Sequence, residues 1–150
     1  MPVALDHRRT VLVIWAALLG GCVAFFAVAA FLRSSGQLPA SEPIELLDWL
    51  ALALPVLLVA LSFTIPGLLR APPGVAPELF ARSRLIVGWA LREGAAIFGT
   101  VVWLLSGDAK ALAGFAIGVA ALAASIPTED RWRGAVEASG GTPGRPPMVR

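Results

Sequence analysis

The stretch GWALREGAAIFGTVVWLLSGD, residues 88–108, is the best guide to the fold of this chain. It contains most of an apolar segment over 85–105, and a helix needs about 20 apolar residues to cross a bilayer core of about 30 Å. An arginine and a glutamate stand side by side inside the segment, at Arg92 and Glu93. The stretch therefore predicts a membrane-spanning helix with two charges among apolar neighbours.

The composition of the whole chain agrees with lipid as its main solvent. Of the 150 residues, 57% are hydrophobic and only 15% are charged. A soluble domain of this length cannot bury so much apolar surface. The formal net charge of +2 is too small to indicate a nucleic-acid partner. The single cysteine, Cys22, excludes an internal disulfide and a cysteine-based zinc site.

Three further apolar segments predict three further spans, joined by short connections that contain Gly, Pro or Ser. The four predicted spans cover residues 11–32, 46–69, 85–105 and 109–126. The expected fold class is an all-α integral membrane protein, a four-transmembrane-helix bundle over 11–126 that follows a short N-terminal segment, 1–10. A tail over 127–150 is expected to form one short interfacial helix, capped by Thr128, and then to be disordered.

The first predicted span contains loose matches to export signals. The arginine pair before it is typical of a twin-arginine signal, and LLGGC, which ends at Cys22, is typical of a lipidation site. Apolar residues continue past Cys22, however, where a lipoprotein turns polar. We therefore interpret 11–32 as a retained helix and Cys22 as a small buried residue.

The positions of the positive charges predict the orientation, because cytoplasmic loops of membrane proteins are enriched in Lys and Arg. One side of the predicted bundle carries Arg8, Arg9, Arg70, Arg82, Arg84, Arg131, Arg133, Arg145 and Arg150. The opposite side carries only Arg33 and Lys110. We therefore expect both termini in the cytoplasm and a location in the inner (plasma) membrane of a bacterium.

Small residues at four-residue spacing indicate where membrane helices pack closely. They are Ala16, Gly20 and Ala24 in the first span, Ala95 and Gly99 in the third, where Gly88 continues the stripe two turns earlier, and Gly114 and Gly118 in the fourth. The spacing favours packing within the chain and packing between chains equally. In the second span, Pro55 removes a backbone hydrogen bond and predicts a helix kink.

The charged pair makes the third span a marginal insertion on its own. Arg92 and Glu93 together raise the free energy of membrane insertion by about 5–7 kcal/mol. The apolar residues of the span lower it by only about 3–6 kcal/mol. Successive helical residues point about 100° apart, so the two charges need separate explanations. Arg92 is long enough to reach cytoplasmic lipid phosphates. Glu93 must be protonated, hydrogen-bonded, paired with another residue or hydrated, and a neutral Glu bonded to a neighbouring helix is an open alternative to a functional site.

Part of this helix resembles a known family. ALREGAAIFGTVVWLL, residues 90–105, is similar to the carboxylate-bearing helix of the ring-forming rotary-ATPase proteolipid, the c subunit. The resemblance implies that Glu93 binds an ion, but the chain departs from the family pattern through Arg92 beside the carboxylate. As a whole the chain resembles small bacterial four-helix membrane proteins, which supplies no mechanism.

No enzyme, metal or cofactor site is expected, because His7 is the only histidine and no phosphate-binding motif is present. The leading hypothesis is a non-enzymatic accessory or assembly subunit that packs in the bilayer against other membrane subunits or against itself. One alternative is a small proton- or cation-coupled transporter that uses Glu93. Another is a lipid-contacting scaffold with Arg92 on an anionic head group.

Overall fold

The computed structural model describes residues 3–36 and 45–140, and all the regular structure in this part of the chain is helical. Its elements are α1 (Val3–Ser34), α2 (Glu45–Leu68), α3 (Pro77–Ser106), the 3-10 turn η1 (Ala109–Ala111), α4 (Leu112–Ala123) and α5 (Glu129–Glu137). Among these, α1, α2 and α3 are long and apolar enough to cross a membrane. The chain is therefore a helical membrane protein.

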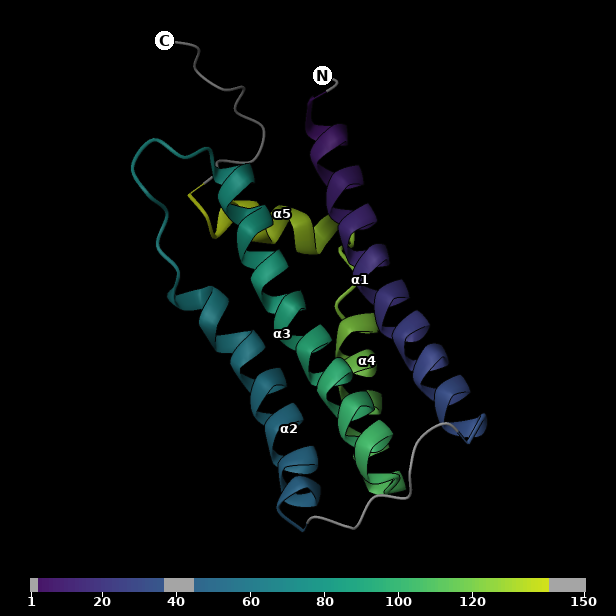
Figure 1. Ribbon diagram of the computed structural model, residues 1–150. Helices are drawn as coiled ribbons and strands as arrows, with labels where there is room; N and C mark the ends of the chain where they lie inside the picture. Colours follow the sequence, from purple (N-terminus) through teal and green to yellow (C-terminus); the bar gives the residue numbers. More distant parts are fainter. Residues whose placement is uncertain (1–2, 37–44, 141–150) are drawn as a thin grey trace.

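The central helix is α3, which packs against α1, α2, α4 and α5. Figure 1 shows α1 and α2 on opposite sides of it, with α4 behind. It begins at Pro77, which fixes the first helical turn, and Glu78 complements the positive helix end. Its 30 residues make it about 45 Å long. It is thus longer than the predicted span over 85–105 and longer than the thickness of a bilayer core, about 30 Å.

The other end of α3 is closed by Arg33, the last basic residue of α1. Its Nη1 donates hydrogen bonds to the backbone carbonyls of Leu104, at 3.0 Å, and Trp103, at 3.3 Å. The C-cap residue Gly107 has a φ of 74°, and a Cβ there would run into the guanidinium group. A cation on the last carbonyls stabilises a helix end, so Arg33 links α1 to α3.

The small residues of α3 and α4 bring the two backbones into contact within the chain. A Cβ on Gly99 would lie 2.7 Å from the carbonyl carbon of Gly114, and one on Gly118 would lie 2.8 Å from the Cα of Ala96. The predicted stripe on α3 is buried throughout, from Gly88 to Gly99, Ala95 included. These glycines therefore pack the bundle itself.

The small residues of the first span have a different place. Ala16, Gly20 and Ala24 are exposed on α1. A Cβ on Gly20 would meet no atom within 4 Å. This stripe consequently contributes nothing to packing inside the described part of the chain.

The fourth apolar segment is shorter than predicted. In place of one span over 109–126, η1 is followed by the 12 residues of α4, which make about 18 Å of helix. The helix ends at Ala123 because the chain turns toward the buried Pro127, and a proline cannot continue the hydrogen-bond ladder. Since α4 packs against α1, α2 and α3, less of it needs to face lipid.

Pro55 lies inside α2, and its ring packs against α4. A Cβ on Gly114 would lie 2.7 Å from Cγ of Pro55. The helix continues through the proline to Leu68. Pro55 is therefore a buried packing residue at the contact between α2 and α4.

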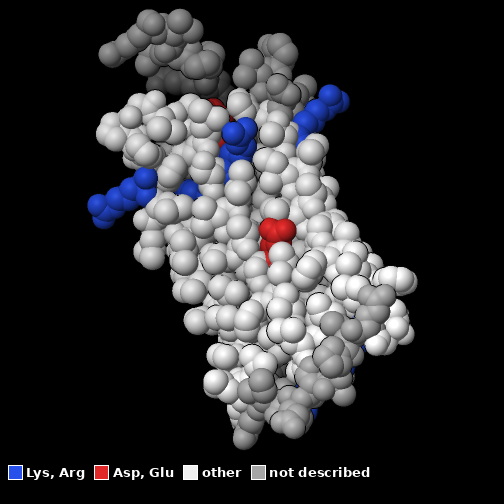
Figure 2. Space-filling view, viewed as in Figure 1, with Lys and Arg blue, Asp and Glu red and all other residues white. Residues whose placement is uncertain are grey.

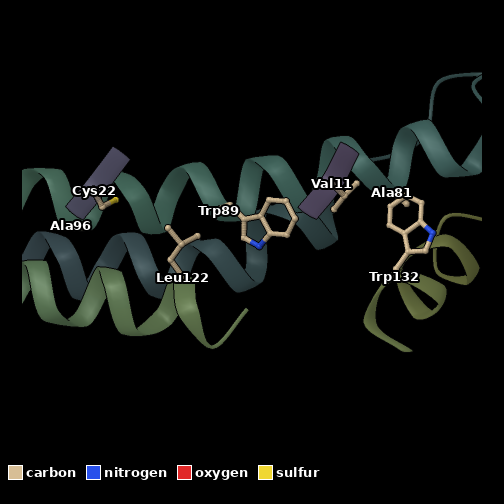
Figure 3. Packing of buried hydrophobic residues seen from close by; sticks show 7 residues of the cluster. All are labelled: Val11, Cys22, Ala81, Trp89, Ala96, Leu122 and Trp132. Carbon is tan, nitrogen blue, oxygen red and sulfur yellow. The ribbon is translucent and has the colours of Figure 1, made fainter. Parts of the chain in front are cut away.

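The core joins α1, α3, α4 and α5. Figure 3 shows Trp89 of α3 near Leu122 of α4, and Trp132 of α5 beside Ala81 of α3. The short helix expected after Thr128 is present as α5, with the Thr128 hydroxyl accepting a hydrogen bond from the Arg131 backbone N–H. Its apolar face packs onto α3. The disorder expected for the tail concerns residues 141–150, which lie outside the described residues.

Candidate intramembrane polar site

The adjacent charges of α3 point to different neighbours. Arg92 is buried, with 7% of its surface exposed, and its Nε donates a hydrogen bond to the Ser62 hydroxyl of α2 at 2.9 Å. Its guanidinium carbon lies 4.6 Å from the centre of the Phe63 ring. Such cation–π contact and hydrogen bonding stabilise a guanidinium group inside the bundle. Arg92 therefore points toward α2.

Glu93 lies on the other side of α3, next to α1. It is partly exposed, and a Cβ on Gly21 of α1 would lie 3.8 Å from its Oε1. No hydrogen bond or ion pair joins Glu93 to another described residue. Glu93 is thus a partly exposed carboxylate beside Gly21 of α1, with no hydrogen-bond or ion-pair partner among the described residues.

The charged side chains are distributed unevenly over the surface of the bundle. In Figure 2, Lys and Arg side chains gather mainly toward the end of the molecule where α5 and the start of α1 lie. An acidic group lies at mid-height, on a face that is otherwise uncharged there. In the four apolar segments, Glu93 is the acidic residue farthest from a helix end.

A pocket of about 200 Å³ opens beside Arg92, between α2, α3 and α5, and we call it the arginine pocket. Its lining includes Ser62 and Phe63 from α2, Arg84, Trp89 and Arg92 from α3, and Ala135 from α5. In its wall, Nε of Arg84 donates a hydrogen bond to the Pro66 carbonyl at 2.6 Å. Glu93 does not line this pocket.

The sequence pointed to Arg92 and Glu93 but not to the residues around them. In the sequence, Ser62 and Trp89 lie within predicted apolar spans, and Arg84 lies in the predicted loop before the third span. The sequence could have indicated a role for Ser62, because a hydroxyl inside an apolar helix needs a hydrogen-bond partner when it is buried. Among the described residues, no three His, Cys, Asp or Glu side chains are grouped so that they could bind a metal ion.

Comparisons of this chain with protein-family models, with curated proteins and with solved structures find no match.

Proposed function

We propose that this protein is a non-enzymatic accessory subunit, which docks another membrane protein against the face formed by Ala16, Gly20, Gly21, Ala24 and Glu93. We call this surface the Glu93 face. The observation that supports the proposal is the unpaired Glu93 carboxylate on the outside of the bundle. The occupant is a transmembrane helix that presents a cation or a hydrogen-bond donor at the depth of Glu93.

The cost of leaving Glu93 against lipid supports a docked partner. A charged side chain near the middle of a span costs about 2.5–3.5 kcal/mol, and ionisable residues inside membranes usually face a protein or a water-filled cavity. A basic or hydroxyl side chain on a neighbouring helix would remove most of this cost. The carboxylate therefore favours a partner of complementary charge.

The shape of the Glu93 face also supports close helix packing. Gly20, Gly21 and Ala24 are exposed on α1 and leave its backbone accessible. Small residues let a second helix approach closely enough for van der Waals packing and interhelical hydrogen bonds. A Cβ on Gly21 would lie 3.8 Å from Oε1 of Glu93, so the carboxylate lies beside the α1 backbone at Gly21 and one helix can contact both.

A different protein fits the face better than a second copy of this chain. In a two-fold symmetric dimer with Glu93 near the axis, the two Glu93 side chains would face each other. The long cationic side chain nearest in sequence, Arg92, is buried and bonded to Ser62. The chain thus lacks an exposed cation at that depth among its described residues, and another subunit must supply one.

The geometry favours this function over cation transport through Glu93. A carrier needs its carboxylate in a cavity that water and the ion can enter. Glu93 does not line the arginine pocket, which lies beside Arg92 and whose arginines repel cations. We therefore prefer docking to transport.

We further propose that α4 completes a four-span bundle in the bacterial plasma membrane, with both termini in the cytoplasm. The start of α1 and the helix α5 lie at the same end of the bundle (Figure 1), and this end has most of the arginines. A phosphatase that is active only outside the cytoplasm, fused after Arg150, is expected to be inactive. Activity of that fusion would contradict the topology.

Site-specific photo-cross-linking in the native membrane tests the docking proposal. A photoreactive residue at Val13, which is exposed two turns before Gly20, is expected to cross-link to one membrane protein. The same residue at Leu57, exposed on α2, is the matched control and is expected not to form this product. The product should disappear when Glu93→Ala is added. A product that persists in that variant, or no protein product from Val13, would contradict the proposal.

A further inference from the structure

The arginine pocket contains hydrogen-bond donors that the protein does not use. Nε of Arg92 is bonded to Ser62, but no hydrogen bond joins its Nη atoms to another described residue. Arg84 bonds through Nε to Pro66 and, at 3.5 Å, through Nη1 to the Ala138 carbonyl, and its Nη2 has no such partner. A guanidinium has five N–H donors. Donors from both arginines are therefore available to a bound molecule.

The charge of the pocket is also uncompensated. The ion pairs among the described residues join Arg8 and Arg133 to Glu129, and Lys110 to Asp108. Neither arginine of the pocket takes part in one. A buried charge without a counter-charge is strongly unfavourable, so the pocket favours an anion.

The residues that line the pocket indicate which class of anion it can bind. They include the rings of Phe63 and Trp89 and the side chain of Leu85. The volume of about 200 Å³ far exceeds the roughly 15 Å³ that one water molecule requires. A polyatomic anion fits this space, and an anion that is attached to an apolar chain can also use the apolar walls.

We propose that the arginine pocket binds a phosphate group, whose oxygens accept hydrogen bonds from the guanidinium groups of Arg84 and Arg92. Guanidinium groups match phosphate oxygens in geometry and form charge-assisted bonds with them. The phosphate comes from an anionic phospholipid head group or from the free ion. This inference is independent of the proposed docking at the Glu93 face, which lies on the other side of α3.

Native mass spectrometry of the purified full chain in mild detergent tests this inference. The protein is titrated separately with phosphatidylglycerol and with inorganic phosphate, and the bound adduct is quantified. One adduct is expected for the wild type, with affinity reduced about tenfold or more in Arg84→Met and in Arg92→Met. The matched control is Arg82→Met, two residues from Arg84 on the same helix and outside the pocket, which should bind normally.

The two titrations identify whether the phosphate group belongs to a lipid or to a free ion. An arginine-dependent adduct with phosphatidylglycerol alone indicates a lipid, and one with inorganic phosphate indicates a free anion. Should Arg92→Met lose its helical circular dichroism, Arg84→Met decides the result, because its partners are backbone carbonyls at the pocket edge. The absence of an adduct in both arms, or an adduct that neither arginine substitution weakens, would overturn the inference.

Discussion

Replacing Gly118 by leucine is expected to destabilise the bundle strongly. The α-carbon of Gly118 faces Ala96 so closely that a Cβ would lie 2.8 Å from both the Cα and the Cβ of Ala96. The obstacle is mainly backbone, so a rotamer change cannot remove it. Overpacking a core typically costs about 1–3 kcal/mol, and a leucine adds three further carbon atoms beyond the Cβ. Separation of α4 from α3 is the expected result.

The measurement is unfolding in mixed micelles, followed by helical circular dichroism as the fraction of a denaturing detergent rises. Gly118→Leu should unfold at a much lower fraction than the wild type, with Gly118→Ala between them. Gly20→Leu is the matched control, because a Cβ on Gly20 meets nothing within 4 Å. Equal unfolding of Gly118→Leu and the wild type would show that α3 and α4 are not in backbone contact.

Gly20→Leu is in turn expected to separate the protein from its partner while leaving its own fold unchanged. Gly20 is exposed on α1 next to Gly21, and a Cβ there would meet no atom within 4 Å, so a leucine at this position clashes with nothing inside the chain. It would, however, hold a docking helix away from the α1 backbone and from Glu93. Close packing at small residues is the main attraction between membrane helices, so we expect the affinity to fall more than about tenfold.

The matched control for this variant is Gly67→Leu, because Gly67 is an exposed helical glycine of α2 that also has no atom within 4 Å of a Cβ. Co-purification from native membranes should fail for Gly20→Leu and succeed for Gly67→Leu. If both variants retained the partner, the α1 stripe would not belong to the interface.

The sequence was sufficient to predict that α1, α2, α3 and α5 exist, because the signals for a helix are local. Apolar length predicted α1, α2 and α3, and Thr128 before an amphipathic segment predicted α5. The start of α3 at Pro77 was missed, although Pro77 and Glu78 are a typical helix start. The length of α4 was overestimated because an alanine-rich segment continues past the point where the chain turns toward Pro127.

The candidate site was predictable only in part, because its surroundings depend on tertiary packing. The cost of burying Arg92 and Glu93 marked both residues from the sequence, and helical geometry required them to point apart. That Arg92 would bond to Ser62, thirty positions earlier, depends on how α2 and α3 are aligned. The cap that Arg33 forms on α3 is likewise a contact between helices that are distant in sequence.

Native mass spectrometry of the protein, extracted gently from its own membranes, tests most directly whether the Glu93 face docks another subunit. We predict a complex of fixed stoichiometry with a different membrane protein, and loss of that complex in Glu93→Ala. A wild-type protein that arrives alone, or only with further copies of itself, would contradict the proposed function.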